Sequence, residues 1–126
     1  AYYRPATDSV NMPRLGLFRS AEEYYSTLFH ELIHSTGHKS RLDREGITEF
    51  AGFGSETYSK EELVAEFTSA FLADESGIDT TRENSTAYIQ SWLRKLEDDP
   101  GLLVTAAGKA QRAANRILGI TAKDTK

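Results

Sequence analysis

The segment His30-Glu31-Leu32-Ile33-His34 is an H-E-x-x-H motif, a combination of residue types and spacing that suits metal chemistry. In a helix, side chains four residues apart lie on one face with Cβ atoms ~5–6 Å apart. Two imidazoles at this spacing can converge on one ion at bond lengths of about 2.0–2.1 Å. Glu31 lies about 100° further round the helix, where its carboxylate could reach a metal-bound water. The motif therefore predicts a metal site with a general base beside it.

Random placement of residues is a poor explanation for the presence of this motif. Only 3 histidines occur among the 126 residues, and two of them stand in the motif. Random placement at this composition produces H-E-x-x-H on the order of once in a hundred chains. Cysteine is absent, so a transition-metal site must use imidazole and carboxylate ligands. We therefore predict that His30 and His34 are metal ligands and that Glu31 is the catalytic base.

Two imidazoles leave the ligand set incomplete, because catalytic zinc has three protein ligands and a water. His38 is a candidate, but the metzincin pattern requires its third histidine at position 40, which is Ser40. The only methionine, Met12, precedes the motif and cannot form a later Met-turn. The metzincin class is therefore excluded, and a carboxylate becomes the better third ligand.

The third ligand is predicted on the next long helix. Glu62 and Glu66 share one stripe of that helix, whereas Glu61 is predicted to point toward solvent. In zincins with a Glu ligand, an acid four residues later orients a ligating histidine, and such supporting carboxylates are common at metal sites. We assign the ligand role to Glu62 and the orienting role to Glu66. The alternatives are that Glu66 is the ligand, or that Glu62 only caps the helix and Glu66 lies on the surface.

Three weaker features complete the candidate set. Tyr58, one turn before Glu62, could donate to an oxyanion, although a tyrosine there more often packs. His38 is predicted either at the rim of the site or in a hydrogen bond within its loop. The last predicted helix has a basic face, usually a solvated feature, formed by Lys109, Arg112 and Arg116.

The elements that must position these residues begin with a hairpin predicted over residues 1–13. Ser20 and Glu23 then form a capping box that opens the helix carrying the motif. Gly37 supplies a natural stop for this helix. Residues 38–58 are predicted to be a long connection, a feature that is usually functional in a compact domain.

The second half of the chain is predicted to be helical. A second capping box, Ser59 with Glu62, opens a helix that runs over 59–76. A third helix is predicted over roughly 85–97 and a fourth over 100–118, the latter with a proline in its first turn. The fold class that follows is α+β, mostly helical, with a small N-terminal β element.

Length and composition limit what the chain can be. Its 126 residues and 14.0 kDa are one domain's worth, and 39% hydrophobic residues suffice for one core. No apolar run approaches the ~20 residues that cross a bilayer, and no secretory signal is visible. The net charge of −4 argues against a dedicated nucleic-acid-binding surface. The abrupt start in strand-like residues suggests a piece of a longer polypeptide.

Several longer segments carry a resemblance beyond the five-residue motif. They are Tyr3-x-Pro5-Ala6-Thr7-Asp8 with Met12-Pro13, Tyr24-Tyr25-x-Thr27-Leu28-x-His30-Glu31-Leu32-x-His34-Ser35-Thr36-Gly37-His38 with Arg41-Leu42, Phe53-Gly54-Ser55-Glu56, Glu61-Glu62-Leu63-Val64-Ala65-Glu66, Glu83-Asn84, Tyr88-Ile89-x-x-Trp92-Leu93 and Ala110-Gln111. With these segments the chain resembles the zincin-like metallopeptidase domain of ArdC-type antirestriction proteins and related polyvalent proteins of plasmids and phages. The resemblance covers nearly all of residues 1–126.

The resemblance implies a gluzincin-like fold and a plasmid- or phage-encoded protein acting in a bacterial cytoplasm. Such proteins usually carry an N-terminal domain that binds single-stranded DNA, which is not among these 126 residues, so we expect DNA contact only through that absent domain. The expected cofactor is one Zn²⁺ per chain, or another divalent metal. The expected partner is a protein or peptide substrate, such as a host restriction component. No contact with a membrane is expected.

Two classes of function compete with the leading prediction, a zinc-dependent peptidase. In the peptidase, zinc lowers the pKa of a water toward ~7, Glu31 takes the proton, and the hydroxide attacks a peptide carbonyl. The first alternative is a non-catalytic zinc-binding scaffold or docking module that helps to protect incoming DNA from restriction. Glu31 favours the enzyme, because a structural site needs no base. The second alternative, nucleic-acid binding by this chain, would need the basic face of the last helix.

Overall fold

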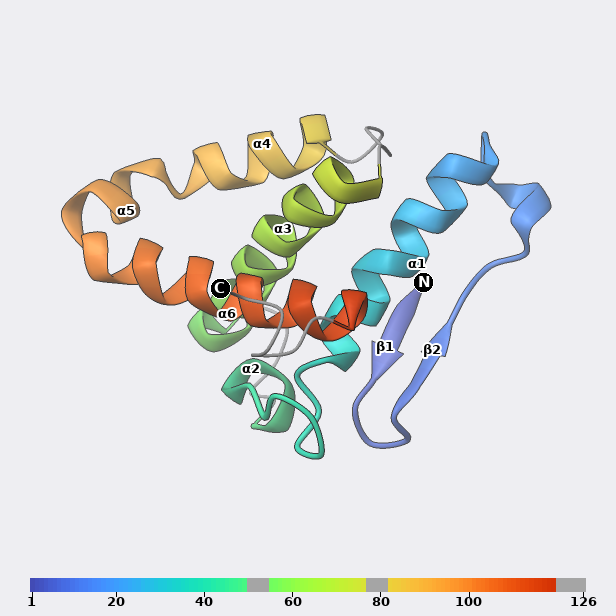
Figure 1. Ribbon diagram of the computed structural model, residues 1–126, viewed down its shortest axis with the longest axis horizontal. Helices are drawn as coiled ribbons and strands as arrows, with labels where there is room; N and C mark the ends of the chain where they lie inside the picture. Colours follow the sequence, from blue (N-terminus) through green and yellow to red (C-terminus); the bar gives the residue numbers. More distant parts are fainter. Residues whose placement is uncertain (50–54, 77–81, 120–126) are drawn as a thin grey trace.

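The computed structural model describes residues 1–49, 55–76 and 82–119, and it is mostly helical with one small sheet (Figure 1). The predicted α+β class is confirmed. The elements in chain order are β1 (Tyr2–Arg4), β2 (Ser9–Asn11), a 3₁₀ helix η1 (Leu15–Leu17), α1 (Ala21–Ser35), α2 (Glu45–Thr48), α3 (Glu56–Ser76), α4 (Arg82–Ser91), α5 (Leu93–Asp98) and α6 (Pro100–Leu118).

The predicted N-terminal hairpin is present and is tied to the end of α1. β1 and β2 pair antiparallel, with Tyr3 opposite Val10. Asp8, in the turn, has a φ of 50°, a conformation that Asp tolerates better than most residues. Its carboxylate accepts hydrogen bonds from the Tyr3 hydroxyl at 2.8 Å and from Arg41, which follows α1. The hairpin is therefore fixed against the segment that follows the H-E-x-x-H motif.

The helix α1 begins as the sequence predicts. The Ser20 hydroxyl accepts from the Glu23 backbone N–H at 3.1 Å, which satisfies one of the helix's free N-terminal donors. Gly37 follows the end of the helix, but a close contact explains it better than a left-handed backbone, since Gly119 is the glycine with positive φ among the described residues. A Cβ at Gly37 would lie 2.7 Å from Ile47 Cγ1 and 3.0 Å from Arg44 Cζ.

The connection predicted over 38–58 is shorter than expected, because it contains α2 and because α3 begins at Glu56. The N-terminal cap predicted at Ser59 is wrong. The Ser55 hydroxyl instead accepts from the Tyr58 N–H at 3.2 Å, while Ser59 lies inside the helix and donates to the Ser55 carbonyl at 3.1 Å. A serine inside a helix can bond the carbonyl four residues earlier, so it need not start one. The stretch 50–54 lies outside the described residues.

The core lies on both sides of α3, which crosses the centre of the molecule (Figure 1). On the side of α4, α5 and α6, the buried cluster consists of Leu63, Val64, Trp92, Leu96, Ala106 and Ala110. On the side of α1, it consists of Ile33, Ala65, Leu72 and Ala114. The third predicted helix is divided into α4 and α5 at Trp92, which packs in the core. Because α3 packs against α1 on one side, it holds its acidic residues next to the motif.

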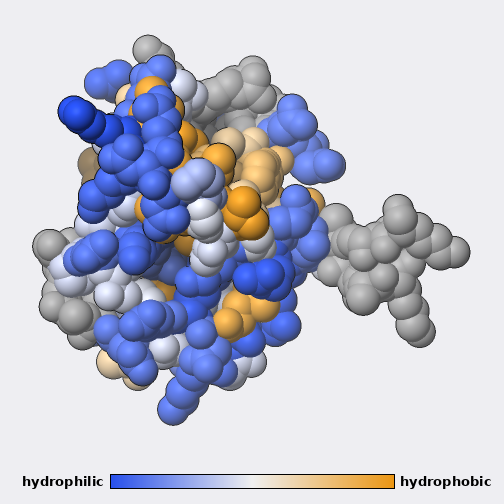
Figure 2. All heavy atoms as spheres, turned by 90° about the vertical axis from the view of Figure 1, so that its left-hand side faces the viewer, coloured by the Kyte–Doolittle hydropathy of each residue, from blue (hydrophilic) through white to orange (hydrophobic). Residues whose placement is uncertain are grey.

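No helix among the described residues is both long and apolar enough to span a bilayer. Figure 2 shows apolar side chains among mostly hydrophilic ones on the end face that holds α5 and the start of α6. The exposed large hydrophobic residues of α5 and of the start of α6 are Leu93, Leu103 and Val104. α5 and the start of α6 lie at the end of the molecule opposite the hairpin (Figure 1).

Gly46 gives a test of how tightly α2 and α3 pack. A Cβ at this position would lie 2.5 Å from Glu61 Cβ and 3.2 Å from the Thr57 carbonyl oxygen. We expect Gly46→Ala to lower the free energy of unfolding by ~1–3 kcal/mol, the usual cost of overpacking, as measured by urea denaturation. Gly16→Ala is the matched control, since nothing lies within 4 Å of its Cβ. Equal stability of the two variants would contradict the close contact.

Candidate metal centre

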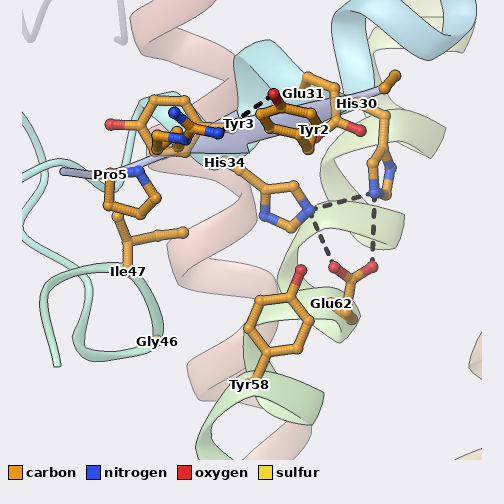
Figure 3. A pocket seen from close by; sticks show the side chains of 12 residues that line it. Tyr2, Tyr3, Pro5, His30, Glu31, His34, Gly46, Ile47, Tyr58 and Glu62 are labelled. Atoms are coloured by element: carbon orange, nitrogen blue, oxygen red, sulfur yellow. Dashed lines mark hydrogen bonds and ion pairs between the residues drawn. The ribbon is translucent and has the colours of Figure 1, made fainter. Parts of the chain in front are cut away.

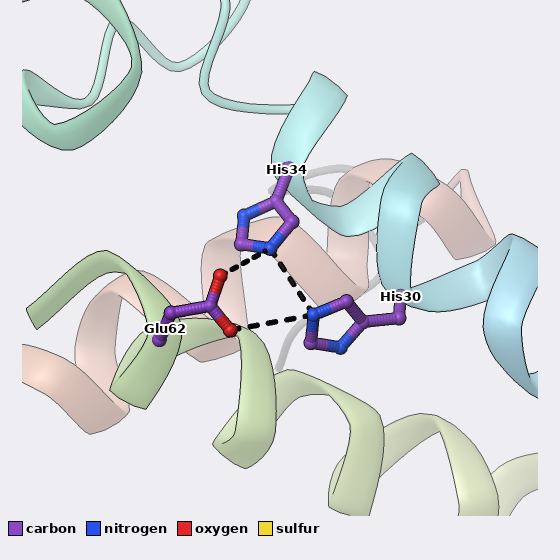
Figure 4. A group of neighbouring side chains, drawn as sticks. All are labelled: His30, His34 and Glu62. Atoms are coloured by element: carbon purple, nitrogen blue, oxygen red, sulfur yellow. Dashed lines mark hydrogen bonds and ion pairs between the residues drawn. The ribbon is translucent and has the colours of Figure 1, made fainter. Parts of the chain in front are cut away.

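Two helices bring three predicted ligands together. His30 and His34 project from α1, and Glu62 projects from α3 to meet them (Figure 4). Their nearest atoms are separated by 3.2 Å (His30 Nε2 to His34 Nε2), 3.0 Å (His34 Nε2 to Glu62 Oε1) and 3.4 Å (His30 Nε2 to Glu62 Oε2). A tetrahedral ion with bonds of 2.0–2.1 Å needs ligand atoms about 3.3–3.4 Å apart. The donor types and spacing therefore fit a divalent ion, and ligation by these residues stays a prediction.

The electrostatics of this group also suit a cation. Burial of the His34 imidazole opposes its protonation, yet hydrogen bonds and negative charge from Glu61 and Glu62 raise its pKa to about 9. Burial likewise opposes ionisation of Glu62, but the two imidazoles hold the pKa of this carboxyl far below its usual range. The carboxylates thus stabilise positive charge at the point where the three side chains meet.

The acid that bonds a predicted ligand is Glu61, which the sequence pattern assigns to solvent. That prediction is wrong, because Glu61 is only 3% exposed. Its Oε2 lies 2.9 Å from His34 Nδ1, a hydrogen bond between two buried side chains. A carboxylate in this position holds the imidazole ring and favours a proton on Nδ1.

Arg44 explains why Glu61 can be buried. The guanidinium donates to both carboxylate oxygens, from Nε to Oε1 at 2.8 Å and from Nη2 to Oε2 at 2.9 Å. It also donates to Thr36 Oγ1 at 2.7 Å and to the Ile33 carbonyl at 2.9 Å. Sequence reasoning missed the roles of Arg44 and Glu61, because neither residue lies on an apolar stripe or in the H-E-x-x-H motif. An acid directly before Glu62 was the only signal available.

Glu66 faces the other histidine without bonding it. Its Oε1 lies 3.9 Å from His30 Nδ1, which is too long for a hydrogen bond. Its side chain is 16% exposed, so it does not turn fully to solvent. The predicted role of Glu66 in orienting a ligating histidine stays a prediction, and the geometry gives Glu61 the shorter contact.

The three side chains open into a cavity of about 460 Å³ (Figure 3). Glu31 lines the same cavity, half-buried, next to the predicted ligands. The residues that line the cavity come from β1 and its two flanking positions and from α1, α2 and α3. They are Ala1, Tyr2, Tyr3, Arg4, Pro5, His30, Glu31, His34, Gly46, Ile47, Tyr58 and Glu62. The structure therefore places the predicted base and the predicted ligands on one accessible surface.

The two residues predicted at the rim have different positions. The Tyr58 ring lies parallel to the His34 imidazole, with centroids 6.2 Å apart and an interplanar angle of 21°. Burial, followed by the charge of Glu62, raises the pKa of Tyr58, so its hydroxyl keeps its proton. His38 does not line this cavity. Its Nδ1 accepts from the Ser40 backbone N–H at 3.1 Å, and its ring borders a neighbouring hollow with Lys39 and Thr48.

Comparison with known proteins identifies relatives that share both sequence and fold. The profile of the zincin-like metallopeptidase family (MPTase-PolyVal) matches residues 1–109. The crystal structure of the Mn(II)-bound antirestriction ArdC protein from the R388 plasmid is similar with a TM-score of 0.79 and 44% sequence identity, covering 96% of this chain and 44% of that one. Its metal-free form gives a TM-score of 0.72 and 45% identity over 90% of this chain and 40% of that one.

Curated relatives are similar over most of this chain. A DNA primase TraC of Escherichia coli is 46% identical over 123 residues, which are 98% of this chain and 11% of that protein. Protein y4eC of Sinorhizobium fredii is 43% identical over 117 residues, which are 91% of this chain and 37% of that protein. The chain thus spans less than half the length of each of these relatives.

Proposed function

This chain belongs to the zincin-like metallopeptidase family, and from that premise we propose that it hydrolyses peptide bonds at the group formed by His30, His34 and Glu62. The observation that carries the proposal is the convergence of these three side chains beside Glu31 in one cavity. We propose one divalent ion per chain, with Zn²⁺ as the first choice. The related ArdC protein has a Mn(II)-bound crystal structure, which supports a divalent ion as the cofactor of this chain.

The catalytic roles follow from where the side chains lie. A divalent ion held by the three ligands would polarise a water and lower its pKa toward ~7. Glu31, on the cavity wall, accepts the proton of the attacking water on its carboxylate and returns it to the leaving amine. Tyr58 keeps its hydroxyl proton and can donate it in a hydrogen bond to the oxyanion that develops on the substrate carbonyl.

The hairpin supports an extended peptide as the substrate. Five consecutive residues, 1–5, line the cavity, as expected of a strand that presents its edge rather than one face. Within the described part of the chain, β1 pairs only with β2. The backbone groups on the other edge can therefore pair with an added strand.

The biological setting of this proposal follows from the relatives. We propose that the chain is the peptidase domain of a plasmid- or phage-encoded antirestriction protein in the bacterial cytoplasm. Its substrate would be a component of the host restriction system. Contact with single-stranded DNA would be made by a separate domain of the whole protein. The similarity to the ArdC antirestriction protein, at 44% identity, supports this assignment.

Metal removal tests the proposed activity. Chelation should reduce hydrolysis of a peptide library to the background rate, and addition of Zn²⁺ or Mn²⁺ should restore it, because water alone is a weak nucleophile near neutral pH. Elemental analysis should show one ion per chain. If the loaded protein cleaves neither the library nor purified restriction subunits, the peptidase proposal is contradicted. A non-catalytic metal-binding module that helps to protect incoming DNA would then be the better assignment.

A further inference from the structure

The His34 imidazole is held from the side opposite the proposed metal. Its Nδ1 bonds Glu61 at 2.9 Å, and Glu61 in turn is gripped by Arg44 through two hydrogen bonds. We propose that Arg44 and Glu61 are positioning residues that fix the His34 ring with Nε2 toward the metal. The inference rests on the metal binding in the proposed function, and it does not require peptide hydrolysis.

The chemistry of Glu61 determines which ring nitrogen is free. An ionised carboxylate can only accept hydrogen bonds, so the contact to Glu61 requires a proton on Nδ1 of His34. Nε2 is then the nitrogen left to bind an ion. This atom lies 3.0 Å from Glu62 Oε1 and 3.2 Å from His30 Nε2, which is where the three proposed ligands meet.

Arg44 keeps the Glu61 carboxylate ionised and oriented. Both side chains are almost fully buried, at 5% and 3% exposure. A buried carboxylate requires a partner of opposite charge with good geometry, and the two parallel bonds from the guanidinium provide it. Arg44 is itself anchored at the end of α1, through Thr36 Oγ1 and the Ile33 carbonyl. The segment after α1 is therefore connected to the proposed ligand by an unbroken chain of hydrogen bonds.

Two glycines restrict the movement of the Arg44–Glu61 ion pair. A Cβ at Gly37 would lie 3.0 Å from Arg44 Cζ, and a Cβ at Gly46 would lie 2.5 Å from Glu61 Cβ. Each side chain of the pair thus packs directly on a glycine backbone, which leaves little room for it to move. His30 differs, since the acid facing its Nδ1, Glu66, is 3.9 Å away. The arrangement fixes one proposed ligand much more firmly than the other.

Zinc titration of the full 126-residue chain tests the proposal. Loss of a group that orients a ligand typically weakens metal binding ~10–100-fold, and we expect this loss in Glu61→Gln and in Arg44→Met. Because a single variant leaves one buried charge without its partner, either may fold poorly. The double variant Glu61→Leu with Arg44→Met removes both charges and should also bind zinc ~10–100-fold more weakly. The fold-decrease in zinc affinity of the double variant should not equal the product of the fold-decreases in the two single variants, because both residues act on the same ring.

Glu75→Gln is the matched control, because Glu75 is an exposed acid on the same helix, and its zinc affinity should equal that of the unmodified chain. NMR of the zinc-loaded protein measures the Nδ1 proton of His34 directly. If the Arg44–Glu61 ion pair only stabilised the fold, its removal would leave this signal unchanged. The Nδ1 proton of His34 should appear far downfield and exchange slowly, and Glu61→Gln should shift this signal and speed its exchange. Glu75→Gln should leave it unchanged.

Unchanged zinc affinity in the folded double variant would overturn the proposal, as would an unchanged His34 signal in Glu61→Gln. The Arg44–Glu61 pair would then be a buried ion pair of the fold only. Failure of the peptidase proposal has a different signature, since the unmodified chain would bind zinc, the variants would bind it weakly, and no peptide would be cleaved.

Discussion

Replacing Glu31 with glutamine is expected to lower the rate of peptide hydrolysis by ~10²–10⁴-fold, the usual contribution of a positioned proton acceptor. The substitution preserves the size of the side chain and removes only its basic carboxylate. Glu31 lines the cavity but is not one of the three grouped ligands, so the metal content should stay at one ion per chain. Elemental analysis and a peptide-cleavage assay on the same preparation measure the two effects separately.

Glu22→Gln is the matched control for this experiment, because Glu22 is an exposed acid in the first turn of the same helix. Its rate and metal content should match those of the unmodified chain. Hydrolysis that survives Glu31→Gln at full rate would show that this carboxylate is not the base. A second outcome concerns biology, since antirestriction by the whole protein that survives the substitution would separate that function from peptidase chemistry.

Removing a proposed ligand should abolish stoichiometric metal binding. His34→Ala deletes the most buried imidazole of the group, at 4% exposure, and leaves two donors where catalytic zinc needs three. We expect the metal content to fall from about one ion per chain to near zero, for His30→Ala as well as for His34→Ala. Elemental analysis after dialysis measures this loss, and full retention in the double variant would reject the site.

The third histidine and the two acids of α3 provide the comparisons. His38→Ala should keep its metal, because this ring bonds Ser40 and does not line the cavity. Glu62→Ala should lose the metal, whereas Glu66→Ala should only weaken its binding. The opposite result for the two acids would move the ligand by one helical turn, from Glu62 to Glu66.

Local rules were enough to predict the part of the site that lies on one helix. His30 and His34 share a face because residues four apart always do so in a helix, and Ser20 begins that helix through a bond to a residue three positions later. The helix that starts at Pro100 and ends before Gly119 was predicted for the same reason. Each of these features depends on contacts within a few residues of sequence, so the sequence alone contains the information.

Glu62 was predicted by an argument that only partly depends on local structure. Helical periodicity places Glu62 and Glu66 on one stripe, and the requirement of zinc for a third ligand selects that stripe. Which of the two acids lies next to the histidines depends on the position of α3 along the axis of α1 when the two helices pack. The packing places Glu62 within 3.0 Å of His34 and leaves Glu66 at 3.9 Å from His30.

Only the tertiary structure determined the support behind His34. Helical periodicity assigned Glu61 to solvent, because the periodicity describes a single helix. It contains no information about a second segment that packs over that face of the helix. Arg44 belongs to such a segment, and its ion pair with Glu61 joins residues 17 positions apart in the sequence. A buried carboxylate is stable only where an opposite charge and hydrogen bonds compensate its loss of hydration. The sequence by itself determined the two histidines of the motif and their helix, and the approach of Arg44 decided that Glu61 is the acid bonded to His34.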